Sequence, residues 1–159
     1  MIGGDMVKLP TIGIWFYLTG TEFCEVDISK KLGIAADEFR AKKDWPDAIK
    51  RNKDLLNLPY WYKPRTVWAK KINAEHGYFI NEQFEKMINL LEGKEGLIND
   101  LRQELDLVVS FEIVIEMELG DKPEMILSSE TIKFISSLNA TIGIDMYIDE
   151  EVSSSFLTL

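Results

Sequence analysis

The hydrophobic pattern of this chain changes its period near residue 106, and that change limits the fold more than any other feature. Before it, apolar residues recur every three or four positions. The resulting stripe consists of Phe84, Met87, Ile88, Leu91, Ile98, Leu101 and Leu105. It predicts an amphipathic helix over residues 81–105, with Asn81 as its N-cap. Gly93 and Gly96 weaken the middle of this helix enough to kink or split it.

After the change, residues 107–119 alternate between apolar and mostly polar side chains, which predicts a strand that is buried on one face only. The face expected to be buried carries Val109, Phe111, Ile113, Ile115, Met117 and Leu119. The face expected to be in water carries Ser110, Glu112, Val114, Glu116 and Glu118. A sheet with one wet face is typical of an α+β protein whose helices gather on the other face.

The N-terminal part repeats this alternation. Residues 11–18 predict a strand whose second face carries Trp15 and Tyr17. Residues 25–32 predict a short helix, because Gly33 follows at the position where a left-handed C-terminal cap would lie.

The C-terminal part predicts a further helix and strand. Ser128 or Ser129 is expected to cap a helix that ends at Asn139, and residues 140–148 are expected to form a strand. The side chains expected to point inward are Ile132, Ile135, Leu138, Ile142, Ile144, Met146 and Ile148. On this expectation, truncating Ile144 to alanine would cost roughly 2–5 kcal/mol.

Residues 35–65 have no sustained period, and prolines interrupt them. We interpret them as a long, partly ordered insertion, followed by a weaker strand candidate at residues 66–72. The aromatic residues between 45 and 68, with basic residues near them, are the only feature that resembles nucleic-acid recognition by stacking. Aromatic residues in such an insertion more often hold a loop on the core or anchor a protein contact.

Together these elements predict an α+β fold, a two-layer sandwich with mostly one sheet and helices on one face. Its two halves are each expected to be a ferredoxin-like βαβ unit, joined by the long helix. We expect a single domain over residues 1–159, with a core at about 11–149, an insertion at 35–65 and a tail at 150–159.

Composition limits the class of protein. With 46% hydrophobic and 28% charged residues, the chain has the composition of an ordinary globular protein. No apolar run approaches the roughly 20 residues of a membrane span, and the N-terminus lacks the pattern of a secretory signal. We therefore expect a soluble, cytoplasmic protein.

The single cysteine and the single histidine give no support for metal or redox chemistry. Cys24 has no second thiol with which to form a disulfide or a zinc pair, and we expect it to be a small buried residue. His76 is expected in an exposed turn. No glycine-rich phosphate loop is present either, so we expect no metal, no cofactor and no catalytic residue.

The charge is distributed unevenly. The formal net charge is −9, yet residues 35–71 hold ten lysines and arginines against five acidic residues. The rest of the chain holds eight basic residues against twenty-two acidic ones. An acidic body argues against nucleic acid as the partner, because phosphate contacts need clustered basic side chains.

Three segments carry a resemblance to a known family. They are the helix end Ile28-Ser29-Lys30-Lys31-Leu32-Gly33-Ile34, the helix start Ser129-Glu130-Thr131-Ile132-Lys133-Phe134-Ile135 and the strand Asn139-Ala140-Thr141-Ile142-Gly143-Ile144-Asp145-Met146-Tyr147. With the acid-rich long helix between them, they resemble the bacterial family of domain of unknown function 4279 over about residues 11–149. The resemblance implies no assigned activity and supplies no catalytic residue. It also implies a similarity to small immunity proteins that accompany bacterial toxins.

The wet face of the sheet is the candidate binding site. It is expected to display Trp15, Tyr17, Glu112, Val114, Glu116, Glu118, Asp145 and Tyr147. Aromatic anchors among carboxylates suit the binding of a basic protein, such as a toxin domain. Two alternatives stay open: the basic insertion covers this face, or paired carboxylates on it perform acid–base chemistry.

The leading hypothesis is therefore a non-enzymatic protein-binding module of the toxin-immunity type. The alternative is a small-molecule-sensing or catalytic α+β domain with an unrecognised site.

Overall fold

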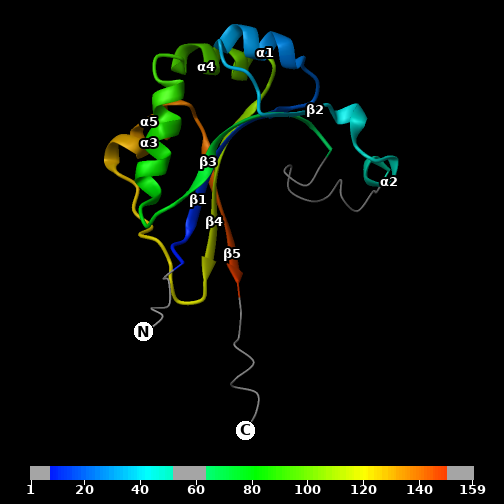
Figure 1. Ribbon diagram of the computed structural model, residues 1–159. Helices are drawn as coiled ribbons and strands as arrows, with labels where there is room; N and C mark the ends of the chain where they lie inside the picture. The colour runs from blue at the N-terminus through cyan, green and yellow to red at the C-terminus, as the bar shows by residue number, and fades with distance from the viewer. Residues whose placement is uncertain (1–7, 52–63, 150–159) are drawn as a thin grey trace, which may run out of the picture.

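The computed structural model describes residues 8–51 and 64–149 (Figure 1). The strands are β1 (Thr11–Gly20), β2 (Glu38–Arg40), β3 (Thr66–His76), β4 (Val108–Glu118) and β5 (Thr141–Asp149). The helices are α1 (Glu25–Leu32), the 3₁₀ turn η1 (Lys42–Asp44), α2 (Asp47–Lys50), α3 (Ile80–Leu91), α4 (Glu95–Glu104) and α5 (Ser129–Ser137).

The strands form one mixed sheet in the order β2-β3-β1-β4-β5. Helices α3 and α5 lie together on one side of it, and α1 and α4 lie at one end (Figure 1). This confirms the predicted two-layer α+β sandwich. Strand β1 is antiparallel to both of its neighbours, whereas β4 and β5 are parallel and are joined through α5 as a βαβ unit.

The predicted βαβ unit in the first half is wrong in one respect. Its second strand, β3, is antiparallel to β1. Because β2 is antiparallel to β3, it is β2 that runs parallel to β1, with β3 between them. The first half is therefore a split βαβ arrangement. Part of the segment interpreted as an insertion, residues 38–40, supplies its edge strand.

The long helix is split at Gly93, which takes φ of 81° and separates α3 from α4. Phe79, not Asn81, is the N-cap of α3. The side-chain oxygen of Asn81 instead accepts hydrogen bonds from the Ser128 amide and the Thr131 hydroxyl, both at 2.9 Å. The Ser128 hydroxyl caps α5, as predicted, by accepting from the Thr131 amide at 3.2 Å. These bonds tie the start of α3 to the start of α5.

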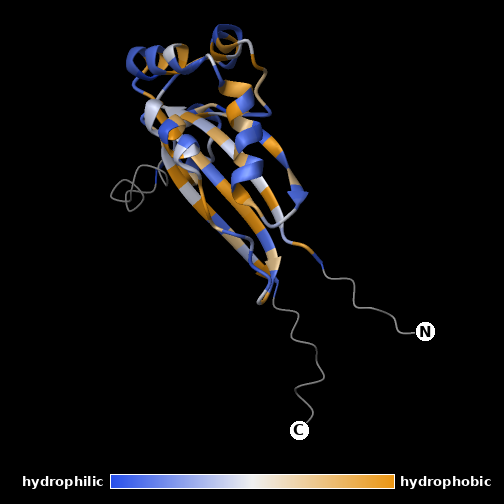
Figure 2. Ribbon diagram, turned by 90° about the vertical axis from the view of Figure 1, so that its left-hand side faces the viewer, coloured by the Kyte–Doolittle hydropathy of each residue, from blue (hydrophilic) through white to orange (hydrophobic). Residues whose placement is uncertain are grey.

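The core lies between the sheet and the helix layer, and Figure 2, viewed from the helix side, shows hydrophobic bands along the strands behind the helices. Helix α3 packs on β1 and β3, and α5 packs on α3. The residues of β1 and β4 that face away from Trp15 and Glu112 are buried: Ile12, Ile14, Phe16, Leu18, Val109, Phe111, Ile113, Ile115 and Met117. Ile28 and Leu32 of α1 are buried as well. The largest fully buried side chains include Trp68, Phe16, Phe84 and Phe111.

Strand β5 departs from the predicted burial. Ile142, Ile144 and Met146 do lie on the helix side, since they pair with the buried Phe111, Ile113 and Ile115 of β4. All nine residues of β5 are nevertheless exposed, with Ile144 at 52%. The physical reason is position: β5 is the edge strand, and α3 packs on β1 and β3 instead.

Three further burial predictions are wrong. Leu119 is 71% exposed because it follows the end of β4, and Ile132 is 54% exposed because it lies on the outer side of α5. Cys24 is exposed because it is the N-cap of α1, at the surface. His76 is exposed as expected, although it ends β3 and does not lie in a turn.

Candidate functional site

The strand register places the eight predicted binding residues on one face of the sheet, the side away from α3 and α5, which we call the open face. Trp15 of β1 pairs with Glu112 of β4. In turn, Val114 pairs with Asp145 of β5, and Glu116 pairs with Tyr147. Trp15, Tyr17, Glu112 and Val114 are half-buried, whereas Glu116, Glu118, Asp145 and Tyr147 are exposed.

An aromatic pair forms the centre of the open face. The rings of Trp15 and Tyr17 stack with centroids 5.7 Å apart and an interplanar angle of 10°. Alternate residues of a strand lie on the same side, which is why this local spacing brings the two rings together. Lys71, opposite Trp15 on β3, places its Nζ 5.5 Å from the centre of the indole. The indole face therefore already holds one cation, as expected for cation–π contact.

Beside the aromatic pair lies a cluster of carboxylates and phenols. Tyr17 and Asp145 both lie close enough to the Glu112 carboxyl group to act on its charge. The Tyr147 hydroxyl donates to Asp145 Oδ2 at 3.2 Å. Three strands thus bring together groups that are far apart in the sequence.

The electrostatics of this cluster follow from its partial burial and its like charges. Burial is the largest cause that raises the pKa of the Glu112 carboxyl, and the negative charge of Asp145 is the next. The nearby Tyr17 hydroxyl lowers this pKa in part. Burial and Glu112 together raise the pKa of Tyr17. The charge of Asp145 raises the pKa of Tyr147. The cluster therefore disfavours additional negative charge and would favour a cation placed against it.

One glycine leaves space beside this cluster. Gly143 is exposed and pairs with Glu112, and a Cβ added there would meet its nearest heavy atom only at 4.0 Å. The missing side chain therefore leaves space on the open face next to Glu112.

Lys71 and Glu38 also lie on this face, although the sequence pattern did not predict them there. Glu38 of β2 pairs with Ala69 of β3, and Ala69 pairs with Tyr17 of β1. The charge of Glu38 contributes to the raised pKa of Tyr17. The only signal in the sequence for Lys71 was its place in the weaker strand candidate. Its position opposite Trp15 could be predicted only from the register of β1 with β3.

The basic segment, residues 35–71, forms part of one edge of the sheet through β2. Arg40 lies over the ring of Trp45 at 5.3 Å, and Trp45 Nε1 donates to the Arg65 carbonyl at 2.8 Å. Asp37 accepts from the Lys71 amide at 2.8 Å. These contacts place its described residues beside β3. Residues 52–63 lie outside the described part of the chain, so whether they cover the open face stays an open alternative.

The other candidate groups do not converge. His76 Nδ1 lies 3.2 Å from the Leu9 carbonyl, and Cys24 is at the opposite end of β1. Within residues 8–51 and 64–149, no group of three or more histidine, cysteine or acidic side chains could hold a metal ion. None of the helices in those same ranges is long and apolar enough to cross a membrane.

In a comparison with known protein families, residues 10–149 match the family described as Domain of unknown function (DUF4279). No curated protein and no solved structure matches the chain. The matched range begins just before β1 and ends with β5, so it contains every strand and helix described above. The chain therefore belongs to the DUF4279 family.

Proposed function

We propose that this chain is a protein-binding module that receives a basic segment of a partner protein on the open face, as an immunity-type inhibitor receives a basic toxin domain. One observation carries the proposal: the stacked Trp15–Tyr17 pair lies beside the Glu112–Asp145 carboxylates on a sheet face that no described helix covers. Aromatic side chains are typical anchors of protein interfaces, and an acidic surface accelerates encounter with a basic partner.

The intramolecular contact of Lys71 supports a cationic partner group. Its ammonium already lies over Trp15, which shows that the indole accepts a cation in this environment. A lysine or arginine of the partner would find Glu112 and Asp145 beside the same rings. The positive charge of the partner would offset the repulsion between the Glu112 and Asp145 carboxylates, which would stabilise the bound state.

The experiment uses the product of the gene adjacent to this one, because an immunity protein is encoded next to its toxin in the type of system proposed. Its binding to the full chain would be measured by surface plasmon resonance. Trp15→Ala or Tyr147→Ala should speed dissociation and cost on the order of 2 kcal/mol of binding free energy.

Melting of the same variants without the partner separates binding from folding. If residues 52–63 covered the open face, these substitutions would lower thermal stability and leave binding unchanged. Unchanged binding together with lost stability would refute the proposal, as would an adjacent gene product that does not bind the chain.

A second candidate function is favoured by the Glu112–Asp145 pair itself. A carboxyl group whose pKa is raised beside a second carboxylate can act as a general acid, so the pair could serve a small-molecule or catalytic site. Among the residues of the open face, Thr11, Glu116, Glu118 and Tyr147 line a cavity of about 230 Å³, which is smaller than the roughly 300–1,000 Å³ of typical small-molecule sites. A small molecule that raises the melting temperature of the chain, but not that of Glu112→Gln, would favour this second function.

A further inference from the structure

The free edge of β5 is the feature of the described structure that its own fold leaves unexplained. Strand β5 ends the sheet, and its outer edge has no partner strand within residues 8–51 and 64–149. Its nine residues are all exposed, including the apolar Ile142, Ile144, Met146 and Ile148 on the helix side. Strands that pair in parallel are usually covered on both faces, and β5 is covered on neither.

The strand carries few of the features that usually protect an edge from pairing, since Asp145 and Asp149 are its only charged residues. The segment TIGIDMYID contains no proline and no lysine, and its register with β4 runs without a bulge. The other edge of the sheet is different, because β2 has only three residues and ends in Arg40. A long apolar edge of this kind is a template for another strand.

We propose that β5 pairs antiparallel with β5 of a second copy of this chain, about a two-fold axis at Ile144, so that two sheets become one. This proposal is independent of the function proposed for the open face. In this register Ile142 lies opposite Met146 of the second copy, and Ile144 lies opposite its own equivalent. The apolar side chains of both copies then meet on the helix side, and the two open faces become continuous.

Charge argues against the register whose axis lies at Asp145, the middle residue of β5. An axis at Asp145 would place that carboxylate directly opposite its own equivalent, which destabilises a strand pair. With the axis at Ile144, Asp145 lies opposite Gly143 and Tyr147 lies opposite Thr141. The pairing then runs from residue 140 to residue 148 without like charges directly opposite each other.

Sedimentation equilibrium of the full chain tests the proposal. The wild-type chain should form a dimer, and Ile144→Lys should weaken its dissociation constant by at least about tenfold, because two lysines would lie directly opposite each other. The matched control is Ile132→Lys, since Ile132 is as exposed, at 54%, but lies on α5. It should leave the dissociation constant nearly unchanged. Rising salt should tighten the dimer, because it screens the repulsion between two acidic copies.

Disulfide cross-linking tests the register even if Ile144→Lys does not fold. In a background with the exposed Cys24 replaced by serine, Ile144→Cys should cross-link two copies, because directly opposite Cα atoms lie about 4.5–5.5 Å apart. Asp145→Cys should not, because its equivalents lie diagonally, about 7–8 Å apart. A chain that stays monomeric in sedimentation, or one in which Asp145→Cys cross-links faster than Ile144→Cys, would overturn the proposal.

Discussion

Two isoleucines that pair across neighbouring strands should differ sharply in their contribution to stability. Ile113 of β4 and Ile144 of β5 lie opposite each other on the same side of the sheet, but Ile113 is 0% exposed and Ile144 is 52% exposed. Replacing an isoleucine by alanine removes about three methylene equivalents, worth about 0.8 kcal/mol each when fully buried. For Ile144, about half of this contribution applies and solvent fills the space, so the expected loss is about 1 kcal/mol. For Ile113, the cavity adds to the transfer term, and the expected loss is about 2–5 kcal/mol.

Urea denaturation followed by tryptophan fluorescence measures both losses. It should be run at a dilute protein concentration, at which the chain is monomeric, and again at a concentration at which the dimer forms. The loss for Ile144→Ala should grow with concentration, because dimerisation stabilises only the folded chain. The loss for Ile113→Ala should change much less. Equal losses for the two variants in the dilute, monomeric chain would refute the burial difference on which this reasoning depends.

Two further predictions concern single groups. The pKa of Glu112 is raised in the folded chain, so the folded state binds the carboxyl proton more tightly than the unfolded state does. The free energy of unfolding should therefore fall as the pH rises from the usual glutamate range through the raised pKa. Glu112→Gln should flatten this part of the curve of melting temperature against pH, and a curve unchanged by the substitution would contradict the cause given for the shift. Cys24→Ser and His76→Gln should leave partner binding and melting unchanged, and stoichiometric zinc or iron in protein purified without added metal would contradict this.

The alternation of residues along a strand predicted which side chains share a face, but it did not predict how well each face is covered. In β4, with a strand on either side, every inward residue through Met117 is buried. The same alternation in β5 placed Ile144 and Met146 on the correct side, yet they are exposed. Burial depends on which strand ends the sheet and on where the helices pack, and neither property is encoded in the local period.

The candidate site was predictable as a set of residues but not as a cluster. The period of two placed Trp15 and Tyr17 on one side of their strand, and that spacing alone makes the rings neighbours. Tyr17 lies near Glu112, and Glu112 near Asp145, only because of the registers of β1 with β4 and of β4 with β5. Strand order and register are set by the whole fold, so no local pattern could supply them.

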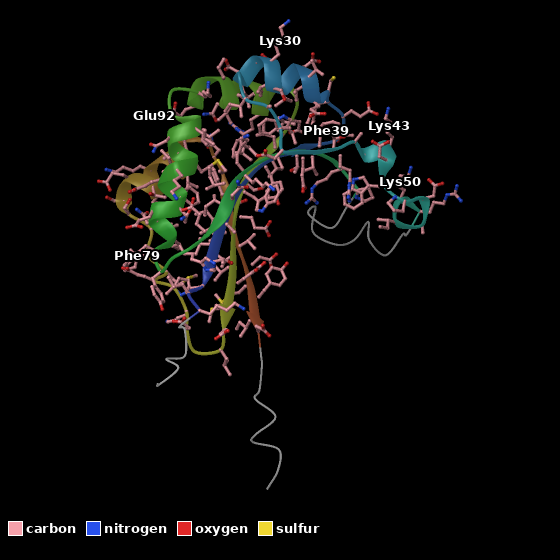
Figure 3. All side chains as sticks on the ribbon, viewed as in Figure 1. Lys30, Phe39, Lys43, Lys50, Phe79 and Glu92 are labelled. Carbon is pink, nitrogen blue, oxygen red and sulfur yellow. The ribbon has the colours of Figure 1, made fainter. Side chains whose placement is uncertain are left out.

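The most direct test of the open face as a binding site for basic segments is a titration with a hexa-arginine peptide followed by NMR. The peptide should shift amide resonances of β1, β4 and β5 around Trp15 and Tyr147, and Glu116→Lys should weaken binding several-fold. The matched control is Glu92→Lys, which makes the same charge change at the end of α3 on the helix side (Figure 3) and should have little effect. Equal weakening by the two substitutions, or shifts confined to the helix layer, would show that the peptide responds only to overall charge and would contradict the proposed site.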